Sequence, residues 1–317
     1  MATFLSRRQF VTQSGATLLG AGLLQARPAA LAANPVPVSL VDSFTYCLNT
    51  ATVRGHKLGL VGEVELAAKA GYDAVEPWIG SIQKYVEQGG SLAQLKQRIL
   101  DLGLTVESAI GFSSWIVDDA DKRAQGMEQA KRDMDLLARI GGTHLAAPPA
   151  GATNGSDLDL QKAAERYRAL LELGDTIGVV PAIEVWGFSK NLYRLSQSVF
   201  VAVEAGHPKA CVLADVYHLY KGGSDFEGLR LLSAEAMPIF HMNDYPALPR
   251  KQIKDSDRVF PGDGVAPLDE IMTDLRVINP NTVLSLELFN PTYWKRPALE
   301  VAKEGLAKMK QAVQRTL

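Results

Sequence analysis

The chain has 317 residues, of which 47% are hydrophobic and 21% charged, so it is not a disordered, collagen-like or coiled-coil chain. Its 33 Lys and Arg stand against 35 Asp and Glu, which excludes the basic surface that neutralises nucleic-acid phosphates. Two cysteines, Cys47 and Cys211, cannot build a disulfide framework.

The first 32 residues have the order of an export signal. The pair Arg7-Arg8 precedes a weakly apolar stretch, residues 10–24, and an Ala-Leu-Ala pattern typical of a cleavage site ends at position 32. The stretch is too short and too polar for a stable membrane span. We therefore expect residues 1–32 to be a twin-arginine signal peptide, recognised by the twin-arginine export machinery, and the protein to be periplasmic or exported. The alternative is a cytoplasmic protein with a chance arginine pair.

From residue 38 onward, short apolar or β-branched runs alternate with amphipathic stretches, which is typical of a parallel sheet with crossover helices. The predicted strands are 38–42, 74–76, 105–109, 143–147, 179–184, 210–215, 238–241 and 283–287. The predicted helices are 61–70, 92–102, 121–140, 158–177, 192–205, 226–234, 268–277 and 298–314. Glycines are expected to end five of these helices: Gly71, Gly103, Gly141, Gly178 and Gly206.

Eight strand–helix units predict an α/β protein with a single (β/α)8 TIM-barrel domain over residues 33–317. The rival is a doubly wound open sheet, but no Gly-x-Gly-x-x-Gly follows the first predicted strand. The longest stretches without periodicity, residues 44–60 and 244–266, are interpreted as loops over the active face.

Four consecutive predicted strands end in a residue that can bind a metal. These are Glu184, Asp215, His241 and Glu287. In a barrel the loops at the carboxyl ends of the strands open onto one pocket, where three carboxylates would repel one another unless a divalent cation neutralised them. One imidazole among carboxylates favours Mn2+, Mg2+ or Co2+, with Mn2+ as the first expectation, and does not exclude Zn2+.

Each of these residues also has a purely structural interpretation. Glu184 could pair with a neighbouring helix, and Asp215 could cap a turn. His241 could be a core histidine, and Glu287 could pair with Arg296. Four independent structural roles at the ends of four successive strands would be a greater coincidence than one shared metal ion. The pattern therefore favours the metal site.

These residues resemble a known metal site. The pattern is similar to that of the xylose isomerase-like barrels, in the branch that includes sugar isomerases, ketose 3-epimerases and inosose-type enzymes: Glu184, Asp215-x-x-His218, His241 and Glu287. Residues 258–264, Arg-Val-Phe-Pro-Gly-Asp-Gly, resemble the Arg-x-x-Pro-Gly-x-Gly loop of the same family. The resemblance covers essentially the whole mature chain and implies one divalent metal ion bound by Glu184, Asp215, His241 and Glu287.

The resemblance also implies that Glu184 and Glu287 move the proton, while His218 and Arg258 hold substrate oxygens. A carboxylate on each face of an enediolate could remove a proton and return it. Arg258 is always charged and suits an oxygen that gains charge. Its alternative is a surface salt bridge with Asp255 or Asp257.

One departure from the family pattern bears on the substrate. Ketose 3-epimerases carry a second glutamate six residues beyond the ligand of the fifth strand, and here that place is taken by Lys190. A free ketohexose is therefore not the expected substrate. Glu76, at the end of the second predicted strand, and Trp186 are predicted to contact the substrate, since an aromatic face suits a sugar ring.

Several functions remain open. The first is a metal-dependent isomerase or epimerase acting on a small sugar or keto-sugar. The second is a lyase or dehydratase acting on 3-keto sugars or glycosides, since the same enediolate can expel a leaving group. The endonuclease branch of the superfamily needs many histidines for a multi-metal cluster. This chain has five histidines and a negative net charge, which argue against that function. The last is a non-catalytic periplasmic sugar-binding protein. We expect no nucleic-acid partner, and a homo-oligomer is left open.

Overall fold

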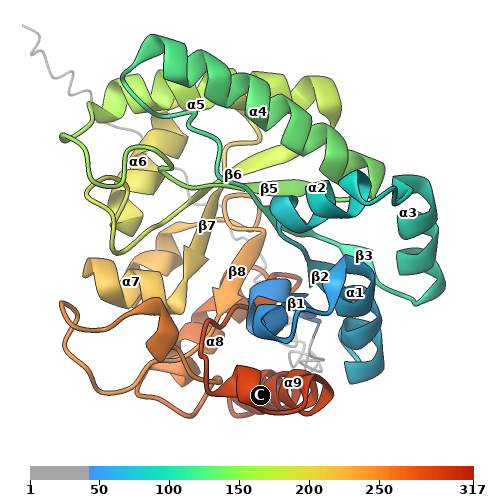
Figure 1. The fold of residues 1–317 in the computed structure, drawn as a ribbon. Coiled ribbons are helices and arrows are strands. Elements are labelled where there is room, and N and C mark those ends of the chain that lie inside the picture. Colours follow the sequence, from blue (N-terminus) through green and yellow to red (C-terminus); the bar gives the residue numbers. More distant parts are fainter. Residues whose placement is uncertain (1–42) are drawn as a thin grey trace, which may run out of the picture. The chain divides into compact units, whose positions relative to one another are not determined.

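The computed structural model describes residues 43–317. The predicted signal peptide, residues 1–32, and the first predicted strand, residues 38–42, lie outside them. In the described part, parallel strands alternate along the chain with helices that surround them (Figure 1). None of the helices in this part is long and apolar enough to cross a membrane.

Nine strand segments form a nearly closed parallel barrel, in the order β3-β2-β1-β9-β8-β7-β6-β5-β4. Their bounds are β1 Thr45–Asn49, β2 Ala74–Glu76, β3 Thr105–Val106, β4 Ser108–Ile110, β5 His144–Ala147, β6 Val180–Glu184, β7 Val212–Asp215, β8 Ile239–Met242 and β9 Val283–Leu286.

Two of the nine segments, β3 and β4, are halves of one strand interrupted at Glu107. The first half pairs with β2 and the second with β5. A parallel bridge between Trp78 and Ile110, with a hydrogen bond from the Ile110 N–H to the Pro77 carbonyl, brings the two ends of the sheet together. The segments therefore occupy eight strand positions, which confirms the predicted (β/α)8 TIM barrel.

Amphipathic helices pack around this barrel. They are α1 Gly59–Ala70, α2 Ile79–Glu87, α3 Leu92–Asp101, α4 Ala120–Arg139, α5 Leu160–Ile177, α6 Leu195–Glu204, α7 Val216–Gly222, α8 Leu268–Ile278 and α9 Ala298–Gln314. Short 3-10 helices are η1 Thr50–His56, η2 Phe226–Leu231, η3 Asp255–Asp257 and η4 Tyr293–Lys295. The five glycines predicted to end helices all adopt positive φ, between 58° and 92°, where a side chain would be strained.

Some predicted elements were wrong. Residues 44–60 are not a loop but contain β1 and η1, because the buried run from Tyr46 to Leu48 forms the first strand. Helices α2 and α7 were not predicted, and α7 begins directly after β7 with no turn residues between them. The helix expected at 226–234 is the shorter η2.

Small apolar side chains, contributed by the strands around the barrel, form a separate buried cluster at its centre. Its members are Cys47, Ala74, Ile110, Ala146, Ala182, Cys211, Leu213, Ile239 and Val283. A much larger cluster packs the outer strand faces against the helices. This arrangement is the filled interior of a barrel, not a pore. It forms an apolar floor below the carboxyl ends of the strands.

Candidate active site and metal centre

Polar side chains lie one layer above this apolar floor. Alternate residues of a strand point to the same side, so Ala182 is followed on the inner face by Glu184, and Ile239 by His241. The polar layer is buried and comes from six strands: Asn49, Glu76, Glu184, Asp215, His241 and Ser285. Glu287 continues the inner face of β9 by one more step.

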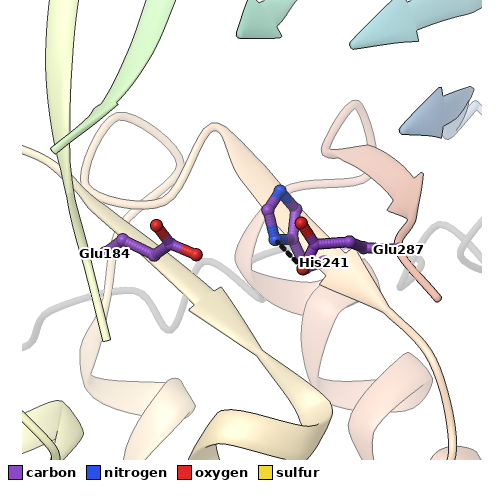
Figure 2. A group of neighbouring side chains, drawn as sticks. All are labelled: Glu184, His241 and Glu287. Carbon is purple, nitrogen blue, oxygen red and sulfur yellow. Dashed lines mark ion pairs between the residues drawn. The ribbon is translucent and has the colours of Figure 1, made fainter. Parts of the chain in front are cut away.

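Three of the predicted ligands meet in one place. Glu184, His241 and Glu287 each offer one ligand atom, and these atoms all lie within 4.8 Å of one another. Figure 2 shows Glu184 reaching from β6 toward His241 and Glu287, which lie side by side. Asp215 is adjacent, with Oδ2 at 3.7 Å from His241 Nδ1, but does not belong to the closest group.

His241 is oriented by a carboxylate on its other side. Its Nε2 lies 3.0 Å from Oε2 of Glu76, and the same oxygen accepts hydrogen bonds from Ser285 and Asn49. Glu76, for which we predicted a substrate contact, is thus fully buried behind His241. A carboxylate that binds the far nitrogen of a histidine fixes the ring and directs the other nitrogen at a metal.

Asp215 and Glu287 are bridged by a buried arginine. Arg258 Nη1 donates to Asp215 Oδ2 at 2.9 Å and to Glu287 Oε2 at 2.8 Å. Its Nη2 lies 3.1 Å from Nε2 of His218 and 2.7 Å from Asp255. The alternative for Arg258 was a surface salt bridge with Asp255 or Asp257. The salt bridge with Asp255 exists, but the guanidinium is fully buried and does not lie at the surface.

Two of the other structural alternatives can be decided. Asp215 does cap a turn, since its Oδ1 accepts the backbone N–H of His218 at the start of α7. That bond leaves Oδ2 directed at the site. Glu287 is not paired with Arg296, which instead binds Glu304.

The loop that carries Arg258 is tied down by one aspartate. Oδ1 of Asp244 accepts the N–H groups of Tyr245 and Ala266, and Oδ2 accepts those of Gly262 and Gly264. A Cβ atom at Gly264 would approach Asp244 Oδ1 to 2.3 Å, so only glycine fits there. The glycines of the sequence motif thus serve the backbone turn that presents Arg258.

The three clustered groups have strongly perturbed acidities. Burial, and then the charge of Glu287, raise the pKa of Glu184 to about 8. Burial also disfavours the charged form of Glu287. The positive charges of His241 and Arg258 outweigh this effect, however, and lower the pKa of Glu287 to about 2. The His241 pKa is raised well above its usual value, since Glu76 and Glu287 outweigh burial. Split acidities of this kind are typical of functional sites.

These residues fit a divalent metal. Glu184 Oε2 is a buried atom that has no hydrogen-bond partner among the described residues. His241 Nδ1 forms no hydrogen bond there either, but it is ion-paired with Glu287 Oε2 at 3.3 Å. A buried polar atom without a partner is costly, and a cation would bind to Glu184 and to the histidine nitrogen. Carboxylate oxygens together with one imidazole are ligands of Mn2+, Mg2+, Co2+ and Zn2+ alike.

Two asparagines support the site. Asn49 was expected only to contribute to substrate specificity, and Asn243 was not identified from the sequence. Asn49 Nδ2 donates to Glu76 at 2.9 Å and to Glu287 at 3.2 Å. Asn243 Nδ2 donates to Asp215 Oδ2 at 3.0 Å. Both directly follow apolar strand residues, and the only available signal was a polar residue at an inner-facing position.

Aromatic side chains form a continuous set of contacts from Arg258 to His218, which we call the aromatic collar. The guanidinium of Arg258 lies 4.9 Å from the ring of Phe289, and the ring of Phe188 lies 5.5 Å from His218. Between these ends, neighbouring ring centroids are 5.1 to 6.0 Å apart. The collar consists of Phe289, Trp78, Phe112, Trp186 and Phe188. Trp186, predicted to bind substrate, is one of its members.

Comparisons with known proteins agree with this fold. A family model described as xylose isomerase-like TIM barrel matches residues 64–312. An inosose isomerase of Bacillus velezensis is 28% identical over 266 residues, which cover 81% of this chain and 92% of that protein. A 3-dehydroshikimate dehydratase of Pseudomonas putida is 26% identical over 246 residues, which cover 77% of this chain but 38% of that protein.

A solved structure shares the fold. The crystal structure of the IolI protein with a binding zinc atom has a TM-score of 0.79 to this chain at 22% sequence identity. The match covers 86% of this chain and 99% of the IolI chain.

Proposed function

The chain belongs to the xylose isomerase-like TIM barrel family, and from that premise we propose that it is a divalent-metal-dependent sugar isomerase or epimerase. The substrate is a small sugar or keto-sugar with a carbonyl next to a carbon that loses its proton. One observation carries the proposal: two buried carboxylates and an imidazole converge within 4.8 Å at the strand ends of the barrel. The inosose isomerase relative supports the same reaction class.

Glu184, His241 and Glu287 would hold the cation, with Asp215 beside them as a fourth ligand. Mn2+ is our first choice because most of these donors are carboxylate oxygens, while the zinc of the IolI structure keeps Zn2+ in consideration. A bound divalent cation would supply Lewis-acid polarisation of the substrate carbonyl. Metal analysis of the purified protein tests this choice.

The protein's own groups move the proton. Glu184 and Glu287 belong to different strands and approach the space between them from different sides (Figure 2). One carboxylate can therefore take a proton from one face of a carbon, and the other can return it to the opposite face. Arg258 and His218, which contact each other beside Glu287, are placed to hold the oxygen that gains charge.

The test is incorporation of deuterium from heavy water into a panel of keto-sugars and ketoses. Glu184→Gln and Glu287→Gln should each lower the rate about 10²–10⁴-fold, since each removes an acid–base group. Glu128→Gln, an exposed change on α4, is the control and should leave the rate unchanged. Full activity in both site variants would refute the assignment.

A dehydratase or other lyase acting on a cyclic keto compound is the second candidate. The dehydratase relative from Pseudomonas putida favours it. Loss of a β-leaving group needs the same initial proton abstraction, so the same residues serve both reactions. The same assay separates the two, because a lyase releases water or an aglycone while an epimerase returns the proton. A sugar-binding protein without turnover would show neither.

A further inference from the structure

A second cavity lies next to the candidate active site, between η1, the first turns of α1 and the start of α2. Its volume is about 170 Å3. Taking about 30 Å3 for each water molecule, it has room for roughly five or six waters or one small ring. Arg54, Glu63, Trp78 and Gly80 line it. Trp78 belongs to both this cavity and the aromatic collar.

Glu63 is a buried carboxylate with an unsatisfied oxygen. Its side chain lies on α1 and the residue is 6% exposed. The buried Oε2 atom accepts no hydrogen bond from any described residue. Burial raises the pKa of Glu63 to about 7, against the smaller opposing effect of Arg54. Glu63 also lines the cavity, so its carboxyl group is placed to accept a hydrogen bond from a ligand bound there.

Arg54 supplies donors to the same cavity. Its guanidinium lies over the ring of Trp78, 4.3 Å from the centroid, and 5.6 Å from that of Phe289. Within residues 43–317 no ion pair involves this side chain, which is exposed at the rim of the cavity. Stacking holds the plane of the guanidinium while its N–H groups remain free to donate.

The cavity wall is connected to the catalytic centre by two hydrogen bonds. Trp78 Nε1 donates to Asn49 Oδ1 at 3.0 Å, and Asn49 Nδ2 donates to Glu287 Oε1 at 3.2 Å. The Trp78 ring thus borders both the cavity and the aromatic collar, whose end members lie beside Arg258 and His218.

We propose that this cavity is a second substrate subsite, which binds a hydroxylated ring attached to the reacting sugar. The substrate is accordingly a glycoside of two rings and not a free monosaccharide. A hydroxyl group donates to Glu63 and another accepts from Arg54, while the apolar face of the ring lies against Trp78. This inference deepens the proposed function and rests on it for the identity of the reacting ring.

The first experiment compares a one-ring and a two-ring substrate, 3-ketoglucose and 3-ketocellobiose. The measured quantity is the ratio of their kcat/KM values in the deuterium-incorporation or elimination assay. Gly80→Leu adds a bulky side chain at a residue that lines the cavity, where a Cβ meets no atom within 4 Å. Glu63→Gln keeps the shape and removes the charge. Each should lower the preference for two rings about tenfold, because Gly80→Leu takes up space in the cavity and Glu63→Gln weakens one charged hydrogen bond.

The matched control is Glu87→Leu, which adds the same leucine at the exposed far end of α2 and should leave the ratio unchanged. A two-ring preference that Gly80→Leu and Glu63→Gln both leave intact would overturn the subsite. So would a wild-type protein that does not prefer two rings.

A binding measurement separates this inference from the proposed function. Titration calorimetry with cellobiose and glucose requires no turnover. We expect cellobiose to bind at least tenfold more tightly than glucose, and Gly80→Leu to remove the difference. If neither keto-sugar reacts but this difference is found, the proposed reaction fails and the subsite stands. Equal binding of the two sugars refutes the subsite, whatever the reaction.

Discussion

His241 lies between two carboxylates, and this position sets its charge when no cation is bound. Glu76 lies 3.0 Å from Nε2 and Glu287 lies 3.3 Å from Nδ1, so both raise the pKa of the ring. Glu184, with a pKa of about 8, also carries a proton at pH 7. A cation must displace both protons, because metals bind the deprotonated forms.

We therefore predict that metal binding at pH 7 releases close to two protons, one from His241 and one from Glu184. Both pKa values are raised, so the apparent affinity should increase as the pH rises, and its slope should decrease once Glu184 ionises near pH 8. Calorimetric titration of Mn2+ in buffers of different ionisation enthalpy measures the release. Glu184→Gln should release one proton fewer. Metal binding without any proton release would contradict the assignment of ligands.

At the scale of single residues, the sequence located the residues that converge better than the residues that support them. Glu184, Asp215 and His241 each stand at the end of an apolar run, where local pattern alone marks an inner-facing polar residue. The role of Glu76 depends on a contact with His241 across 165 positions. No local pattern reports such a contact, so Glu76 was assigned to the substrate.

At the scale of elements, the loop from 258 to 264 shows how a turn can position a charge. Asp244 is 1% exposed and accepts four backbone N–H groups, three of which belong to this loop and its continuation. An antiparallel bridge between Asp244 and Val259 fixes the start of the loop, next to Arg258. The loop is thus a rigid platform for the guanidinium.

Asp244→Ala should lower the free energy of unfolding by about 3 kcal/mol, because it leaves several N–H groups without an acceptor. It should also lower kcat/KM about 10²-fold through displacement of Arg258. Urea denaturation and the deuterium assay measure the two effects. Asp263→Ala, which removes a half-exposed pair with Lys308 in the same loop, should change stability by less than about 0.5 kcal/mol. Equal effects of the two substitutions would argue against an anchoring role.

The strands were predictable because apolar runs bounded by glycines recur at regular spacing. The first strand was missed because β1 contains Thr45 and Tyr46 and ends in Asn49, so it has no long apolar run. Helix α7 was missed because Val216 continues the apolar pattern of β7 without a turn residue. In both places burial in the closed barrel decides the structure, and burial is not a local property of the sequence.

At the scale of the whole molecule, the candidate ligands come from strands that are neighbours in the barrel but distant in the chain. Glu184 and Glu287 are separated by more than a hundred positions. A cation shared by β6, β8 and β9 would link these strands in the folded state only.

We predict that the bound cation stabilises the entire barrel. At a free metal concentration of 100 times Kd, the free energy of unfolding should increase by about 2.7 kcal/mol. Urea denaturation before and after chelation with EDTA measures this difference. His241→Ala should unfold at the same urea concentration with and without metal. An equal response to EDTA in that variant would place the ion elsewhere.

We further propose that the folded barrel is exported by the twin-arginine route, which rests on the sequence of residues 1–32. Replacing Arg7 and Arg8 with Lys should leave the protein in the cytoplasm, since that signal is recognised through the arginine pair. Cell fractionation followed by immunoblotting measures the distribution. A periplasmic protein in the double variant would refute the proposal.

The order of the ligands along the chain has a consequence for biosynthesis. Glu287 follows the last strand of the barrel, so a ribosome must complete every strand of the described barrel before the last of the four proposed ligands exists. A nascent chain cannot capture the ion early, and truncation anywhere before β9 yields a polypeptide with an incomplete coordination set. Acquisition of the proposed metal would therefore be a late step in maturation, in the compartment where the barrel closes.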